Sequence, residues 1–367
     1  MDLAYVVLVG GTLMTRIKTF VIASLVVIAL ARGAKAGTVY LDPLYGIQKT
    51  TTQYTIGRTQ AGNIPLLADI YQPVDIGKGA VPVNRPAIVF QDGGAWVSAD
   101  RTNGRVVTAA KYLTTLGYTV IATDYRQGAT AFGIPVGPDA PVIVGQTEFG
   151  TAPYNGITAS GTVGLVGLPA FRAGIEDFAV AMDWTRDNAA TLGIDPNKIV
   201  AGGGSAGGID ALLLQYNNNP IDARYRAQAV IALVSTMMNN YTRIQPGGPP
   251  VFLLNNTADL TVPWSPQMSQ RFVDVGIYRE QWYQPTTATD HNVRWDDIPT
   301  LVPSATPATS GPNLLERVRD FLVNAQIATP YVAVVPEPST YAMAMTALVI
   351  GAGVSARKRW RAVRRES

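Results

Sequence analysis

The sequence contains no cysteine and a single histidine, His291, among its 367 residues. Without cysteine there can be no disulfide framework, and no thiolate can bind zinc or an iron–sulfur cluster. One histidine also excludes motifs that bind a metal through two imidazoles, so we predict no metal site. Any mechanism that needs an imidazole base has His291 as its one candidate.

Charge is also scarce, and most of the excess positive charge lies at the two ends. Charged residues make up 15% of the chain and hydrophobic residues 47%, which permits a sizeable core. The last eleven residues carry a net charge of +5 and residues 1–36 a net charge of +3, so the total of +3 leaves about −5 for the body. An acidic body lacks the basic patch of nucleic-acid-binding proteins, so we expect no nucleic-acid partner.

The N-terminal segment lacks an apolar run long enough to span a bilayer. Arg16 and Lys18 precede an apolar run at residues 20–31, and Ala34-Lys35-Ala36 has the small-x-small form of a cleavage site. We therefore predict that residues 1–36 are a signal peptide and that the protein is exported. An uncleaved membrane anchor is the alternative, although a spanning helix needs about 20 apolar residues.

The C-terminal segment, residues 331–367, combines three signals. Val335-Pro336-Glu337-Pro338 precedes an apolar run at residues 341–356, and an arginine-rich end follows. Apolar residues closed by positive charge are typical of a stop-transfer segment. Together the signals resemble the PEP-CTERM sorting signal of Gram-negative bacteria. The resemblance implies a transient stay in the membrane, cleavage by an exosortase, and a final location in the periplasm, at the cell surface or outside the cell. A plain C-terminal anchor is the alternative.

Between these segments, residues 37–330 show one alternating series of strands and helices and no internal repeat. Such alternation predicts a single α/β domain, with a mostly parallel sheet and helices on both faces. Residues 127–169, rich in Gly, Pro, Thr and Val, predict a long loop that either walls the active site or is a surface insertion. Asp69 is predicted to point outward from its strand. The predicted strands are 66–71, 86–90, 118–124, 198–201, 227–234, 250–254 and 278–283, and the helices are 105–116, 171–191, 205–216, 266–275 and 313–325.

The run Gly203-Gly204-Ser205-Ala206-Gly207 matches the G-x-S-x-G nucleophile elbow. It follows a predicted strand and opens a predicted helix, as the elbow requires. The strained turn leaves no room for side chains two positions on either side of the serine, and both positions are glycine. We therefore predict that Ser205 is a nucleophile.

The same glycines also match the dinucleotide fingerprint G-x-G-x-x-G, with Asp222 near the expected acidic position. A dinucleotide-dependent oxidoreductase is therefore a second hypothesis. It is disfavoured because the fingerprint should open the first βαβ unit, whereas this run lies in the middle of the predicted sheet.

A serine needs a base, and the base needs an orienting acid. His291 lies in a loop after the last predicted strand, and Asp259 follows the strand at residues 250–254. The chain order Ser205, Asp259, His291 is that of α/β-hydrolases. Other carboxylates near the histidine are weaker candidates for the acid: Asp290, Asp296 and Asp297.

An oxyanion hole is predicted after the strand at residues 86–90. Gln91-Asp92-Gly93-Gly94-Ala95-Trp96 is similar to the His-Gly-Gly-x-Trp loop of esterases, with Asp92 in the place of the histidine. The backbone N–H groups of Gly93 and Gly94, with that of Ala206, would bind the oxyanion. Since main-chain donors do not need the histidine, we expect the hole to survive, and the replacement puts in question only the usual hydrogen bonds that support the loop. A simple Gly-Gly turn is the alternative.

Taken together, residues 60–325 resemble the α/β-hydrolase carboxylesterases of the hormone-sensitive-lipase and feruloyl-esterase-like branches. Asp124-Tyr125-Arg126 and the run at residues 193–199 add to the resemblance. It implies hydrolysis of small or polymeric carboxylic esters through an acyl-enzyme, without a cofactor. Peptidase activity on the same scaffold and a non-catalytic binding protein are the alternatives.

The connection between the strands at residues 227–234 and 250–254 is too short for the cap domain that covers many lipases. We therefore predict an α/β-hydrolase fold with no large cap domain and with Ser205 in a fairly open cleft. Such a cleft would admit bulky esters.

Overall fold

The computed structural model describes residues 43–59, 62–96, 98–127, 162–217, 222–257, 259, 265–285, 291–302, 304, 306 and 308–327. The chain divides into two compact units, Met1–Thr329 and Pro330–Ser367. The predicted signal peptide at residues 1–36 and the predicted sorting tail at residues 331–367 lie outside the described residues, as does most of the loop predicted at residues 127–169.

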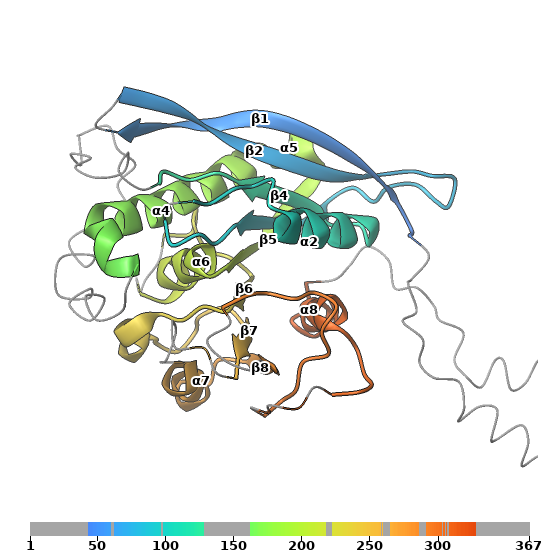
Figure 1. The fold of residues 1–367 in the computed structure, drawn as a ribbon. Coiled ribbons are helices and arrows are strands. Elements are labelled where there is room, and N and C mark those ends of the chain that lie inside the picture. Colours follow the sequence, from blue (N-terminus) through green and yellow to red (C-terminus); the bar gives the residue numbers. More distant parts are fainter. Residues whose placement is uncertain are drawn as a thin grey trace, which may run out of the picture. The chain divides into compact units, whose positions relative to one another are not determined.

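The fold is built on one 8-stranded sheet with the strand order β1-β2-β4-β3-β5-β6-β7-β8 (Figure 1). β1 and β2 form an antiparallel hairpin, β2 is antiparallel to β4, and the pairings from β4–β3 to β7–β8 are parallel. The predicted mostly parallel sheet is therefore confirmed. The strands are β1 Gly46–Thr59, β2 Gly62–Val74, β3 Arg85–Gln91, β4 Thr119–Thr123, β5 Ile194–Gly204, β6 Ala229–Leu233, β7 Val251–Asn256 and β8 Arg279–Gln284.

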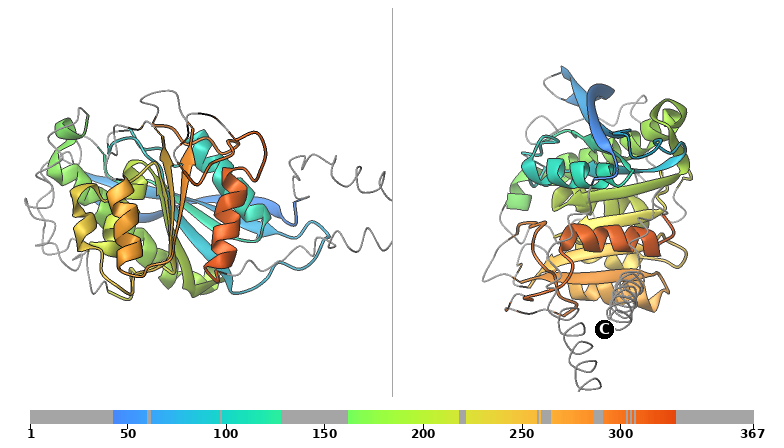
Figure 2. Two further views of the ribbon diagram at one scale, coloured as in Figure 1. Left: turned by 90° about the horizontal axis from the view of Figure 1, so that it is seen from below. Right: turned by 90° about the vertical axis from the view of Figure 1, so that its right-hand side faces the viewer.

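Helices cover both faces of the sheet, as predicted (Figure 2). Helices α4, α6 and α7 pack on one face, and α2 and α8 pack on the other. The bounds are α2 Gly104–Thr115, α4 Thr162–Asp187, α5 Ala189–Leu192, α6 Ala206–Tyr216, α7 Ser265–Asp274 and α8 Leu314–Asn324, with a 3₁₀ helix η3 at Met238–Arg243.

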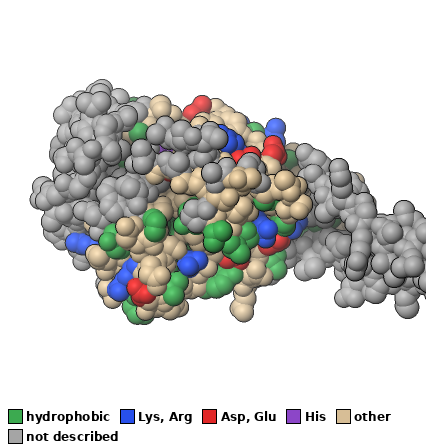
Figure 3. Space-filling model, turned by 60° about the horizontal axis from the view of Figure 1, so that its bottom comes forward, with side chains coloured by type: hydrophobic (Ala, Val, Ile, Leu, Met, Phe, Trp, Pro, Cys, Tyr) green, Lys and Arg blue, Asp and Glu red, His purple; other side chains and the backbone are tan. Residues whose placement is uncertain are grey.

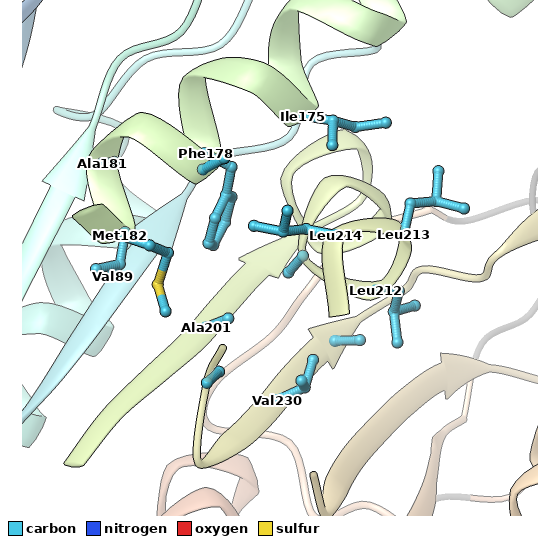
Figure 4. Packing of buried hydrophobic residues seen from close by; sticks show 14 of the residues in the cluster. Val89, Ile175, Phe178, Ala181, Met182, Ala201, Leu212, Leu213, Leu214 and Val230 are labelled. Atoms are coloured by element: carbon cyan, nitrogen blue, oxygen red, sulfur yellow. The ribbon is translucent and has the colours of Figure 1, made fainter. Parts of the chain in front are cut away.

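The central strands are buried on both faces, which explains their near-continuous apolar sequences. Successive residues of a strand point to opposite faces. Accordingly, Val89 of β3 belongs to the core under α4 and α6, whereas its neighbours Ile88 and Phe90 belong to the core under α2 and α8. In Figure 4, Met182 of α4 lies beside Val89, and Phe178 of α4 points toward α6.

The connection from β6 to β7 carries η3 and no cap domain, as the length of this segment predicts. Among the described residues, no helix is long and apolar enough to cross a membrane. On the surface shown in Figure 3, basic and acidic side chains are interspersed with apolar and neutral polar ones.

The predicted start of the long helix was wrong. The sequence predicts a loop up to Pro169 and a helix over residues 171–191, but α4 begins at Thr162 and ends at Asp187. Gly164, Gly167 and Pro169 lower helix propensity and suggested a loop. Extending an existing helix costs far less than nucleating one. The helix that forms after Pro169 can therefore extend toward its N-terminus through these residues.

The predicted outward orientation of Asp69 was also wrong, because β1, which was not predicted, pairs with β2 and places Thr51 opposite Asp69. The Asp69 carboxyl in β2 is 0% exposed. It accepts a hydrogen bond of 2.7 Å from Thr51 Oγ1 of β1 and lies 2.6 Å from Lys49 Nζ and 3.2 Å from Arg101 Nε. Side chains from β1 and from the segment before α2 therefore cover a carboxylate that would otherwise face water.

Candidate active site

Ser205 sits in the sharp turn between β5 and α6, with a left-handed backbone φ of 49°. Few non-glycine residues adopt this conformation, and it persists only where the surroundings enforce it. The Ser205 N–H donates to the Leu233 carbonyl of β6 at 2.8 Å, and the Ser235 hydroxyl donates to the Ser205 carbonyl at 2.9 Å. The turn is thus fastened to the neighbouring strand.

Close backbone contacts explain the glycines around Ser205. A Cβ on Gly203 would overlap the backbone of Gly207 and Gly208, and a Cβ on Gly207 would lie 2.7 Å from the Asp92 carbonyl oxygen. The predicted requirement for glycine two positions on either side of the serine is therefore confirmed. The glycine run follows β5 rather than the first parallel strand, which favours the elbow over the dinucleotide fingerprint.

The structure brings Ser205, His291 and Asp259 together in one hydrogen-bonded chain. Ser205 Oγ lies 2.7 Å from His291 Nε2, and His291 Nδ1 lies 2.7 Å from Asp259 Oδ2. The imidazole is 23% exposed and the carboxyl 2% exposed. With its proton on Nδ1 and donated to Asp259, the imidazole can accept the serine proton at Nε2.

Among the four carboxylates considered for the acid, Asp259 is the one that contacts the imidazole in the described part of the chain. Asp296 is exposed. The Asp297 carboxyl lies 3.6 Å from Arg294 Nη1, and the Asp297 backbone carbonyl accepts the N–H of Leu314 at 3.0 Å. Asp290 lies outside the described residues.

Two amide side chains hold the His291 loop, and the sequence did not single them out. Asn256, the last residue of β7, donates to the Asn292 carbonyl at 3.2 Å. Gln284, the last residue of β8, donates to the same carbonyl at 3.3 Å. Arg105 of α2 donates to the Asn292 side chain at 3.2 Å. The ends of two neighbouring strands and of one helix therefore fix the residue next to the histidine.

The loop predicted to form the oxyanion hole packs directly against Ser205. A Cβ on Gly93 would lie 2.8 Å from Ser205 Cβ, so only glycine fits there. Gly94, Ala95 and Trp96 have φ values of 119°, 51° and 60°. Three consecutive left-handed residues make this an unusually constrained loop. Gly93 thus meets Ser205 from the loop after β3, and Ala206 follows Ser205 at the start of α6.

Asp92, which replaces the histidine of the esterase loop, is buried at 6% exposure. Burial raises the pKa of its carboxyl, while the Gly93 amide and the Arg105 guanidinium act to lower it. The carboxyl accepts the Asp100 N–H at 3.4 Å, and the Tyr125 hydroxyl donates to the Asp92 backbone carbonyl at 3.3 Å. Asp92 therefore takes part in hydrogen bonds that support the loop, through its carboxyl and through its backbone carbonyl.

The fold, with its strand order and its elbow after β5, is the α/β-hydrolase fold. The family model described as BD-FAE matches residues 165–232, which run from α4 to β6 and include the elbow. No curated protein matches the sequence. Within the described residues, no group of three or more His, Cys, Asp or Glu side chains could hold a metal ion.

Solved structures of Thermogutta terrifontis esterase 2 are similar to this chain. The form phosphorylated by paraoxon is 23% identical, covers 77% of this chain and 96% of its own, and has a TM-score of 0.51. The form phosphoramylated by tabun is 22% identical, covers 77% and 97%, and has a TM-score of 0.50. The apo form is 23% identical, covers 79% and 97%, and has a TM-score of 0.50. At this identity the likeness supports the shared fold.

Proposed function

We propose that the protein is a serine esterase that hydrolyses carboxylic esters through an acyl-enzyme. The observation that carries the proposal is the chain of two 2.7 Å contacts from Ser205 through His291 to Asp259, placed on a nucleophile elbow. The BD-FAE match over the elbow and the likeness to an esterase support it.

In the proposed reaction, Ser205 Oγ attacks the ester carbonyl carbon while its proton passes to His291 Nε2. The carbonyl oxygen becomes an oxyanion, which accepts hydrogen bonds from the N–H groups of Gly93, Gly94 and Ala206. Collapse of this intermediate breaks the bond to the alcohol, which leaves with the proton from His291. Water then attacks the acyl-enzyme by the same steps, and the carboxylic acid is released.

Asp259 orients the imidazole and stabilises its positive charge while the proton resides there. Its carboxyl is nearly inaccessible, whereas the imidazole is 23% exposed and Ser205 is half-buried. This arrangement keeps the acid away from water and leaves the reacting serine open to substrate. The reaction as written needs no cofactor.

A substrate panel tests the proposal. We expect the protein to release 4-nitrophenolate from 4-nitrophenyl acetate and butyrate, and to leave the matching 4-nitroanilides nearly intact, since amides are poorer acyl donors. Because the β6–β7 connection carries no cap domain, we also expect hydrolysis of bulky feruloyl and acetylated-sugar esters. Anilide cleavage as fast as ester cleavage would favour a peptidase instead.

We further propose that the protein is exported and that its C-terminal segment is removed near Pro336-Glu337-Pro338. The apolar run at residues 341–356 is short for a permanent span, and the arginines after it would hold that end on the cytoplasmic side. We expect the intact mass of protein from its native host to correspond to a chain from about Gly37 to about Val335. A mass that retains residues 341–367 would indicate a membrane-anchored enzyme and leave the catalytic proposal unaffected.

A further inference from the structure

One buried carboxyl near the nucleophile has no part in the proposed reaction. Asp210 lies in α6, five residues after Ser205, and is 0% exposed. Its two carboxyl oxygens accept the indole N–H of Trp96 at 3.0 and 3.2 Å. Burial raises the pKa of Asp210 well above its ordinary value, the Trp96 bond acts to lower it and the Asp177 carboxyl raises it further. Burying a carboxyl lowers the stability of the fold, so stability does not explain the presence of Asp210 at this position.

The partner of Asp210 belongs to the oxyanion loop. Trp96 is one of the three consecutive left-handed residues of that loop, and it is among the largest fully buried side chains of the described residues. α4 packs closely over the pair at Gly174, where a Cβ would lie 2.5 Å from Asp210 Oδ2 and 2.9 Å from Trp96 Cδ1. The indole is thus confined between α4 and α6, and its N–H is directed at Asp210.

The two sets of proposed oxyanion donors come from different elements. Gly93 and Gly94 belong to the loop after β3, whereas Ala206 begins α6. The Trp96–Asp210 hydrogen bond joins these two elements, because Trp96 belongs to the loop and Asp210 lies in the second turn of α6. This hydrogen bond is important for the loop, because the left-handed backbone of residues 94–96 is strained and needs surrounding contacts to hold its conformation.

We infer that Asp210 is a positioning residue that, through the Trp96 indole, fixes the Gly93-Gly94 loop at the distance from Ser205 and Ala206 that oxyanion binding requires. This inference rests on the proposed esterase function. A donor displaced by about 1 Å can lower a rate by about 100-fold. The bond therefore affects the step in which the oxyanion forms and leaves ester binding in the ground state nearly unaffected.

Four variants test this inference. Asp210→Leu removes the acceptor, Trp96→Phe removes the donor, and Asp210→Asn keeps a carbonyl oxygen that can accept the indole N–H. Tyr216→Phe is the matched control, because Tyr216 ends the same helix and its hydroxyl donates to the Pro249 carbonyl at 2.8 Å, away from the loop. For each, we would measure kcat and KM with an aryl ester, and the inhibition constant of a trifluoromethyl ketone, which adds to serine to form an oxyanion.

We expect Asp210→Leu and Trp96→Phe each to lower kcat by roughly 10- to 100-fold, with KM changed less than about threefold. The inhibition constant should rise in parallel with the loss in kcat, because both report oxyanion binding. The double variant should be little worse than either single one, since both remove the same bond. Asp210→Asn should recover most of kcat, and Tyr216→Phe should lower thermal stability without changing kcat.

A readout independent of turnover separates this inference from the proposed function. We expect faster backbone hydrogen exchange over residues 93–96 in Asp210→Leu and Trp96→Phe than in the wild type, Asp210→Asn or Tyr216→Phe. Wild-type protein without ester turnover would overturn the proposed function, while the exchange rates would still decide whether Asp210 holds the loop. Unchanged exchange in folded Trp96→Phe, or a kcat of Asp210→Leu that equals that of the wild type, would overturn the inference. If Asp210→Leu fails to fold, Trp96→Phe and Asp210→Asn carry the same test.

Discussion

Replacing Ser205 by alanine should lower ester turnover by about 10³-fold or more, and His291→Ala should lower it equally. Ser205 Oγ and His291 Nε2 are 2.7 Å apart, and in the proposed reaction the serine attacks while the histidine accepts its proton, so the loss of either residue removes the same step. The double variant should therefore be no slower than either single variant. Because the chain has no second histidine, another imidazole cannot replace the lost base. Rates of 4-nitrophenyl acetate hydrolysis measure all three losses.

Ser269→Ala is the matched control, because Ser269 is a buried serine in α7 and not part of the site. It should retain the wild-type rate. Full activity in His291→Ala would contradict the mechanism. Asp259→Asn should also lose about 10³-fold or more, since the amide favours the wrong tautomer of the imidazole. If Asp259→Asn were silent and Asp290→Asn were not, the acid would be misassigned and the serine mechanism would stand.

Replacing Asp177 by alanine should lower the free energy of unfolding by about 3–5 kcal/mol, the usual cost of removing one partner from a buried ion pair. Asp177 lies in α4, and its carboxyl is 4% exposed. It lies 2.8 Å from Arg126 Nη2 and accepts the Arg126 backbone N–H at 2.7 Å. Glu176 lies 3.0 Å from the same guanidinium nitrogen and would be the remaining acidic partner. The substitution leaves Arg126 buried, with its backbone N–H unsatisfied.

Asp183→Ala supplies the control on the same helix. Asp183 pairs with Arg224 at the surface, where the guanidinium is 53% exposed, so its loss should have a much smaller effect. Urea titration measures both free energies of unfolding. Equal effects of Asp177→Ala and Asp183→Ala would show that the buried cluster does not stabilise the contact between α4 and the segment after β4.

The strands that are buried on both faces could be predicted from the sequence, because burial gives them a recognisable apolar pattern. β3, β4, β6 and β7 are covered on both faces, so they appear as continuous apolar runs. β1 was missed because it lies at the edge of the sheet and most of its residues are exposed or half-buried, which removes the apolar pattern. Its threonines and Tyr54, which favour strands, were the signal available. The error at Asp69 followed from missing β1.

For the candidate site, the sequence predicted the residues that belong to known motifs and whose order along the chain is informative. It named Ser205, His291 and Asp259, and the structure brings these three within hydrogen-bonding distance. It did not predict Asn256, which holds the loop of His291, or Asp210, which accepts the Trp96 N–H, because the partners of both residues are far away in sequence. An amide or carboxyl inside an element has no pattern of its own, and only the folded sheet brings it to its partner.

Reaction with paraoxon shows whether His291 activates Ser205 as the nucleophile, which is the step on which the proposed esterase activity depends. Paraoxon is a phosphate triester, and attack at its phosphorus displaces 4-nitrophenolate and leaves a diethylphosphoryl group on the attacking oxygen. We expect one such group per chain, on the peptide that contains Ser205, no labelling of Ser205→Ala, and slow labelling of His291→Ala. Labelling of Ser205→Ala at the wild-type rate, or a label on another residue of the wild type, would show that Ser205 is not the activated nucleophile.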